Sequence, residues 1–447
     1  MQPSRFNIIL PDEPGPGQAL AYNTLSGGLF VLEPDYRASL EALAAGTELT
    51  PEDRGRLAEL EAEGFVAADD ALERAATRHR LRGDGYGRSN AVSAKVLTTM
   101  ACNLACQYCF ETHMDRAPRL DEAAAQAVAE RLMRRAEEVD AKEINLDFYG
   151  GEPLLNPQAI AVVAGALQEW EREKEGRSFA FTMTTNGTLL DREMVEKLKP
   201  LGFAAARVSL DGVAAVHDAR RPFRVGGGSS HAAIMANLAE VVDLIKITAT
   251  VTLPGNDTAP FAELLSDLER RGLLHRLAAV QPGLEMAYLD RQGQACGRPD
   301  CAMDAEAAAT FLAMLKLMVA KGVKPHADLL GGHNCALTSE KGPWLFAPDG
   351  GIYKCPMFMD KAEYQVGRLD EPRLLPLFYE LASRERWQDC LENTDCPYVP
   401  LCGSGNGCRL AAVQQTGEFW GFNCAKEFHD AFLPEAMRLE YAVTEMD

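Results

Sequence analysis

The chain has 447 residues, of which 47% are hydrophobic and 25% charged, as expected for a globular protein with more than one domain. Its formal net charge of −20 argues against general nucleic-acid binding, which needs a surplus of Lys and Arg near phosphate. No apolar run approaches the roughly 20 residues of a membrane span, and the N-terminus has no recognisable secretory signal. We therefore expect a cytoplasmic protein that binds neither nucleic acid nor membrane.

Residues 1–80 contain no cysteine and predict a small domain of their own. The pattern predicts, in chain order, two short strands within 21–34 joined by a turn at 26–28, helices at 36–44 and 51–63, and a third strand at 65–66. The second helix has Thr50 as a plausible N-cap and Pro51 at its first position. This combination predicts a winged-helix-like module, followed by a polar, glycine-rich linker at 81–93.

Residues 94–285 alternate between strand and helix patterns. The predicted strands are 94–99, 143–149, 179–185, 204–210, 247–253 and 277–281, and the clearest helix is 121–139. Six strand–helix units predict an α/β fold with a parallel sheet, whose chemistry lies at the carboxyl ends of the strands. A bridging segment with one helix at 305–320 is expected over 286–330.

The twelve cysteines indicate metal binding or catalysis, because a reducing compartment disfavours disulfides. They are Cys102, Cys106, Cys109, Cys296, Cys301, Cys335, Cys355, Cys390, Cys396, Cys402, Cys408 and Cys424. Residues 331–430 hold seven of them, are rich in Gly and Pro, and show little periodicity. We expect this segment to lack a conventional core and to need metals for its stability, and we expect a tail at 431–447.

Cys102, Cys106 and Cys109 follow the first predicted strand of the 94–285 segment. Three thiolates on one loop can bind three irons of a [4Fe–4S] cube and leave the fourth iron open for a small ligand. The alternative is a structural zinc site with His113 as the fourth ligand.

The Cys-x3-Cys-x2-Cys loop, with Tyr108 before its last cysteine, and Gly150-Gly151-Glu152-Pro153 after the second strand resemble the radical S-adenosylmethionine (SAM) superfamily. The resemblance implies a partial (β/α)6 TIM barrel. It also implies a [4Fe–4S] cluster that binds SAM and reduces it to methionine and a 5′-deoxyadenosyl radical, which takes a hydrogen atom from the substrate. The cofactor carries this chemistry, while the protein orients the reactants.

The same resemblance implies a set of SAM-contacting residues. Backbone at Gly150 and Gly151 would hold the SAM amino group, Glu152 would offer a charge near that ammonium, and Arg221 would clamp the carboxylate. The expected cofactor-binding set is Tyr108, Gly150, Gly151, Glu152, Thr185, Asn186, Ser209, Asp211 and Arg221. For the polar members the alternatives are turn chemistry, helix capping or plain surface. No catalytic base is predicted.

The C-terminal cysteines resemble the SPASM domain of peptide-modifying radical SAM enzymes, which binds two auxiliary [4Fe–4S] clusters. The resemblance implies Cys390, Cys396, Cys402 and Cys424 as ligands of the second cluster, and Cys335, Cys355 and Cys408 as ligands of the first. Lys341 stands where relatives often carry a further cysteine. Either Cys296 or Cys301 completes the first cluster, or one iron is open to a substrate thiolate; both cysteines could equally bind no metal.

The N-terminal module resembles the leader-peptide recognition domain of such enzymes, to which a peptide adds as a strand. The expected function is modification of a ribosomally synthesised precursor peptide, with a thioether crosslink favoured and a reductant such as flavodoxin or ferredoxin. Carbon–carbon or aromatic crosslinking, epimerisation and decarboxylation are alternatives. Formylglycine formation, as in anaerobic sulfatase maturases, is less favoured because Pro356 stands where those enzymes carry an aspartate base. A non-catalytic zinc scaffold would not explain the GGEP segment.

Overall fold

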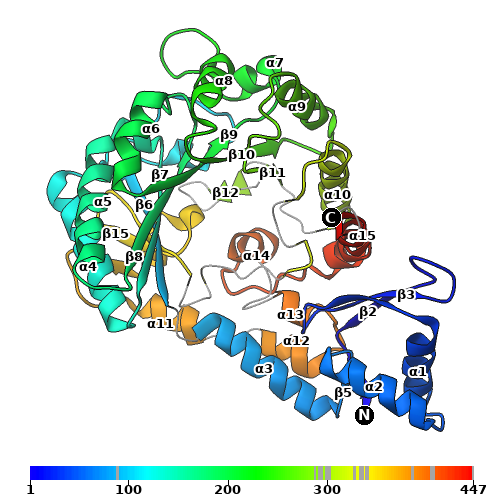
Figure 1. The fold of residues 1–447 in the computed structure, drawn as a ribbon. Helices are drawn as coiled ribbons and strands as arrows, with labels where there is room; N and C mark the ends of the chain where they lie inside the picture. The colour runs from blue at the N-terminus through cyan, green and yellow to red at the C-terminus, as the bar shows by residue number, and fades with distance from the viewer. Residues whose placement is uncertain are drawn as a thin grey trace.

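The computed structural model describes residues 1–86, 90–285, 288–289, 295–296, 304–325, 329–331, 337, 342–383, 387–402 and 408–444. Figure 1 shows three parts: a curved barrel wall with helices outside it, a small N-terminal domain at the lower right, and a C-terminal region, yellow to red, between the two. No helix in these ranges is long and apolar enough to cross a membrane.

The barrel wall contains all six predicted strands as parallel neighbours in chain order. The strands are β6 (Ala91–Thr99), β7 (Glu143–Gly150), β8 (Ser178–Thr185), β9 (Phe203–Ser209), β10 (Lys246–Leu253) and β11 (Ala279–Leu284). The helices are α4 (Glu122–Glu138), α5 (Pro157–Arg172), α6 (Arg192–Leu198), α7 (Ala214–Arg220), α8 (Ser230–Val241) and α9 (Ala259–Arg270). The predicted partial barrel is therefore confirmed.

Side chains alternate along the barrel strands between an apolar outer face and a polar inner face. In β8 and β10 every second residue is buried and the residues between them are partly exposed. The buried side chains of the barrel strands, such as Phe148 on β7 and Phe181 on β8, pack in the main core with the outer helices. Since successive side chains of a strand point to opposite faces, the threonines and charged residues between them line the inside of the barrel.

The C-terminal region extends the barrel sheet, which the sequence did not predict. β14 (Trp344–Phe346) pairs in parallel with β6, and β15 (Gly351–Tyr353) and β16 (Gly367–Arg368) follow, giving nine strands among the described residues. All three residues of β14 are buried. The expectation that residues 331–430 lack a conventional core was therefore wrong for this part, because β14 shares the core of the barrel.

Helices complete the C-terminal region. The predicted helix at 305–320 is α10 (Ala305–Ala320), which packs against α15 (Lys426–Thr444), a helix that crosses the expected start of the tail at 431. The remaining elements are β12 (Tyr288–Leu289), β13 (Ala295–Cys296), α11 (Pro376–Ser383), α12 (Trp387–Asn393), α13 (Val399–Cys402) and α14 (Arg409–Thr416).

The N-terminal domain contains the predicted hairpin, β3 and β4, and both predicted helices, α1 and α2. Its elements are β1 (Gln2–Pro3), β2 (Asn7–Pro11), β3 (Ala19–Asn23), β4 (Leu29–Leu32), α1 (Pro34–Ala45), α2 (Pro51–Ala62), β5 (Val66–Ala67) and α3 (Asp70–Tyr86). Thr50 caps α2 in a reciprocal capping box with Asp53. Three features were not predicted: β1, which pairs with β5, β2, which makes the sheet three-stranded, and α3, which runs into the expected linker.

Candidate active site at the carboxyl ends of the barrel strands

The loop that carries Cys102, Cys106 and Cys109 leaves the carboxyl end of β6 and lies against residues 220–224. The amide of Ala105 donates to the carbonyl of Pro222 at 2.8 Å, and the Arg224 guanidinium donates to the carbonyls of Cys102 and Leu104. Burial raises the pKa of all three thiols, that of Cys102 to about 12. The loop therefore holds three neutral thiols that a bound cation would convert to thiolate ligands.

Gly150 and Gly151 bring the end of β7 against the backbone just before Cys102. A Cβ on Gly151 would lie 2.3 Å from the carbonyl oxygen of Ala101, and Gly150 has a φ of 126°. The amide of Glu152 donates to that same carbonyl at 2.8 Å. Glycine is thus required here by contact between two backbone segments, whereas the sequence suggested approach to a ligand.

Glu152 is fully buried, and its carboxylate faces the protein. It accepts hydrogen bonds from the amide of Asn186 at 2.8 Å, the hydroxyl of Thr185 at 2.8 Å and the amide of Leu154 at 3.1 Å. The Asn186 side chain in turn donates to Asn103 at 2.8 Å and approaches the Cys102 sulfur at 3.8 Å. All of these donors belong to the protein, whereas the resemblance implied the SAM ammonium beside Glu152. The carboxylate thus positions Asn186 beside the cysteine loop.

Tyr108, Asp211 and Arg221 form a second buried network behind the loop. The Tyr108 hydroxyl donates to Asp211, and Arg221 donates to the same hydroxyl. The Arg220 guanidinium carbon lies 4.6 Å from the centre of the Tyr108 ring. In this arrangement Arg221 binds Tyr108 through Nη1, while its Nε has no hydrogen-bond partner within the described ranges.

His217 and Ser209 complete this side of the site. The His217 ring nitrogen Nδ1 accepts from the amide of Asp211 at 3.2 Å, and burial lowers the pKa of His217 to about 3, so the ring is neutral. Ser209 ends β9 and is partly exposed on its inner face. The structure thus gathers the predicted residues of the 94–285 segment at one end of the barrel.

A charged cluster inside the barrel was missed in the sequence. Asp147 on β7 accepts from Lys95 on β6 and from Arg207 on β9, and the hydroxyls of Thr182 and Thr184 on β8 also contact it. The detectable signal was the strict alternation of apolar residues with Lys, Asp, Thr and Arg along predicted strands, which indicates a polar inner wall.

Four C-terminal cysteines line one small cavity. Cys390, Cys396, Cys402 and Cys424 share it with Trp387 and Lys426, among others. Burial, reinforced by the neighbouring thiols, raises the pKa of Cys402 to about 12. Among the described residues no three Cys, His, Asp or Glu side chains are grouped as ligands of a single metal ion.

The other C-terminal cysteines are less completely described. Cys355 follows β15 and is partly buried, and Pro356 opens a short 3-10 helix directly after it. Cys408 precedes α14 as its N-cap residue. Cys301, Cys335 and Lys341 lie outside the described residues, and for Cys296 the structure describes only the backbone, in β13.

The N-terminal domain packs directly on the segment that carries Cys390 and Cys396. Phe6 and Leu81 form a small core with Trp387 and Leu391 of α12 and with Val399 of α13. Around this core, polar contacts run from the N-terminal domain to the backbone of the cysteine segment: Arg5 to the carbonyls of Leu391 and Thr394, Arg74 to that of Leu391, and Thr24 to that of Pro397.

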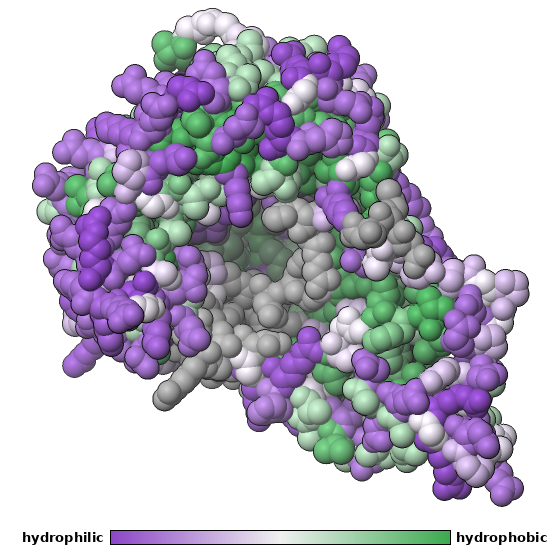
Figure 2. Space-filling view, in the orientation of Figure 1, coloured by the Kyte–Doolittle hydropathy of each residue, from purple (hydrophilic) through white to green (hydrophobic). Residues whose placement is uncertain are grey.

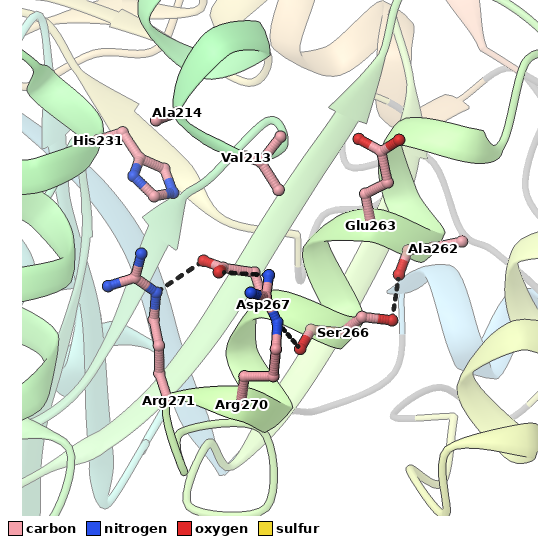
Figure 3. A pocket seen from close by; sticks show the side chains of 9 residues that line it. All are labelled: Val213, Ala214, His231, Ala262, Glu263, Ser266, Asp267, Arg270 and Arg271. Carbon is pink, nitrogen blue, oxygen red and sulfur yellow. Dashed lines mark hydrogen bonds and ion pairs between the residues drawn. The ribbon is translucent and has the colours of Figure 1, made fainter.

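A groove of about 590 Å³ lies on the outer, helical side of the barrel (Figure 3). Asp267 at its centre accepts from Arg270 at 2.9 Å and from Arg271 at 2.7 Å. The two cations and the carboxylates of Asp267 and Glu263 give the groove no surplus charge, and we do not include it in the candidate site.

Comparisons with known proteins agree with this geometry. Residues 96–268 match the family model of the radical SAM superfamily. A serine-type anaerobic sulfatase-maturating enzyme of Klebsiella aerogenes is 26% identical over 327 residues, which cover 66% of this chain and 76% of that protein. A GTP 3′,8-cyclase of Synechococcus sp. is 32% identical over 232 residues, covering 45% of this chain and 63% of that protein.

Two solved structures share the fold at low sequence identity. The structure of anSMEcpe with bound AdoMet has a TM-score of 0.59 and 15% identity, and covers 78% of this chain and 98% of that one. The structure of Streptococcus suis SuiB bound to precursor peptide SuiA has a TM-score of 0.54 and 12% identity, and covers 95% of this chain and 99% of that one. The family match and the cysteine loop together show that residues 96–268 form a radical SAM domain.

Proposed function

We propose that this enzyme modifies a ribosomally synthesised precursor peptide and binds three [4Fe–4S] clusters and SAM. The cluster at Cys102, Cys106 and Cys109 and its SAM would together supply abstraction of a hydrogen atom from the substrate. The donor set fits such a cluster, since three partly buried thiols share one loop and the Asn186 amide lies beside the Cys102 sulfur. Ser209 and Arg221 remain proposed SAM contacts.

The cavity lined by Cys390, Cys396, Cys402 and Cys424 supports the proposed second auxiliary cluster, because a cube takes four thiolates. For the first auxiliary cluster we propose Cys335, Cys355 and Cys408. An iron left open there could bind a substrate thiolate, which is why a thioether crosslink is the favoured product. Thiols used in this way must stay reduced, so we also propose a cytoplasmic location and a flavodoxin or ferredoxin as electron donor.

The observation that carries the peptide assignment is the N-terminal domain, with its three-stranded sheet docked on the cysteine segment. Within the described residues β4 is an outer strand of that sheet, and such an edge can accept a peptide as a further strand. Figure 2 shows apolar side chains gathered over this domain on the side that faces the barrel. The fold likeness to SuiB, which spans the N-terminal region as well, supports the same assignment.

Formylglycine formation is the second candidate, favoured by the 26% identity to the Klebsiella aerogenes enzyme. Candidate precursor peptides incubated with reconstituted enzyme, SAM and reductant separate the two by mass spectrometry. A crosslink removes two hydrogen atoms, consumes a cysteine thiol and joins two residues in the fragmentation spectrum. Conversion of an isolated Ser or Cys to an aldehyde that reacts with hydrazides would instead establish the second candidate.

We expect Phe30→Ser to weaken precursor binding about tenfold, because the ring on β4 is 40% exposed and would lie under an added strand. Ile9→Ser is the matched control, since Ile9 is 38% exposed on β2, the opposite edge of the sheet. Fluorescence anisotropy with a labelled precursor measures the effect. Equal losses in both variants would contradict binding at the β4 edge.

A further inference from the structure

The inner wall of the barrel carries two cations that converge on one carboxylate. Arg207 Nη2 donates to Asp147 at 2.7 Å, and Lys95 Nζ lies within hydrogen-bond distance of the same oxygen. The Asp147 side chain is only 10% exposed, whereas those of Lys95 and Arg207 are 26% and 41% exposed. The carboxylate thus lies beneath the cations, which face the interior of the barrel.

The hydrogen-bond capacity of this cluster is only partly used. Arg207 donates through Nε to Thr184 at 3.4 Å and through Nη2 to Asp147, which leaves Nη1 without a hydrogen-bond partner among the described residues. Lys95 has three N–H donors and uses one on Asp147, while its ammonium lies 5.5 Å from the Tyr149 ring centre. With one carboxylate against two cations, the cluster keeps one surplus positive charge.

The position of the cluster suits recognition of a substrate. Lys95, Asp147 and Arg207 come from β6, β7 and β9, two residues or more before the ends that carry the cysteine loop, the GGEP segment and Ser209. The view along the barrel in Figure 2 is hollowed at its centre. A group that enters the barrel from the candidate active site would therefore meet these cations.

We propose that Lys95 and Arg207 form a carboxylate-binding site that holds an acidic group of the peptide segment brought to the radical. A guanidinium fork matches a carboxylate in two parallel hydrogen bonds, and a neighbouring ammonium adds charge. Asp147 orients both cations and lowers the affinity of the site by competing for them. The proposal rests on the proposed peptide substrate. The carboxylate could belong to an Asp or Glu side chain or to the peptide C-terminus.

Three small probes test the site in the reconstituted holoenzyme by saturation-transfer NMR titration. N-acetyl-glutamate amide carries a side-chain carboxylate, N-acetyl-glycylglycine a terminal one, and N-acetyl-glutamine amide none. We expect at least one acidic probe to bind about tenfold more tightly than the neutral probe, as for one charge-assisted contact. The probe that binds more tightly identifies the source of the carboxylate.

The variants separate recognition from a purely structural role. Arg207→Gln and Lys95→Met should each remove most of the preference for acidic probes, whereas Asp147→Asn should increase it, because both cations are then released. Arg177→Gln, which removes a cation stacked 4.5 Å from the Trp170 ring, is the control and should leave binding unchanged. Circular dichroism verifies folding.

Equal binding of acidic and neutral probes, or a loss of binding in Asp147→Asn that matches the loss in Arg207→Gln, would overturn the proposal. Because the probes require no turnover, this outcome is independent of the test of function: a protein that selects acidic probes but modifies no peptide would refute the proposed function and leave the carboxylate site intact.

Discussion

Gly151→Ala should remove the SAM-binding cluster while leaving the barrel folded. The added Cβ would lie 2.3 Å from the Ala101 oxygen and 2.6 Å from the Met100 oxygen, and these backbone atoms have no rotamer by which to move away. Separation of the two segments would shift the loop of Cys102 relative to Asn186. We expect about four fewer irons per chain and, because the cluster that reduces SAM is then absent, loss of SAM cleavage.

Gly227→Ala is the matched control, because an added Cβ there meets nothing within 4 Å. Iron content and 5′-deoxyadenosine release are measured for both variants, and thermal unfolding verifies that the barrel survives. If Gly151→Ala kept full iron and cleaved SAM at the parental rate, close backbone contact would not be what positions the cysteine loop.

Arg5→Gln should cause loss of the proposed second auxiliary cluster, while the cluster at Cys102, Cys106 and Cys109 stays bound. The Arg5 side chain is 8% exposed and donates to carbonyls at the end of α12, where a cation is also favoured by the helix dipole. Arg74 donates to the same Leu391 carbonyl. Arg5→Gln removes charge-assisted hydrogen bonds to the segment that carries Cys390 and Cys396. We expect this loss to lower the stability of that segment by about 1–3 kcal/mol.

The expected result is a loss of about four irons per chain, with SAM cleavage in the absence of peptide retained. Arg37→Gln is the control, since Arg37 pairs with Asp12 and Glu41 within the N-terminal domain. Electron paramagnetic resonance of the reduced protein shows which cluster is missing. A full iron complement in Arg5→Gln would show that the docked domain is not needed to hold the cysteine segment.

The barrel was predictable because its strands and helices obey local rules. Alternating apolar and polar residues indicated strands such as β8 and β10, and Thr50 indicated the start of α2. The order of strands followed from the regular strand–helix alternation. Family motifs then indicated which loops meet at the carboxyl ends, and the structure brings Cys102, Gly151 and Asn186 together there.

The remainder depends on contacts between distant segments. The pairing of β14 with β6, and the docking of Arg5 on residues 391–395, join parts of the chain separated by hundreds of residues. No local pattern encodes them. The hydrogen bonds of Glu152 were missed for a related reason. Its partners, Thr185 and Asn186, lie at the end of the next strand, whereas the family resemblance implied a charge that faces a ligand.

The central claim is that this chain binds three clusters, one at the barrel and two in the C-terminal region. Iron, acid-labile sulfide and zinc per chain, measured after anaerobic purification and reconstitution, test it most directly. We predict about twelve irons, about twelve sulfides and no stoichiometric zinc, as for three four-iron cubes. About four irons with zinc in the C-terminal cysteines would contradict the auxiliary clusters, and zinc without iron would contradict the radical chemistry as a whole.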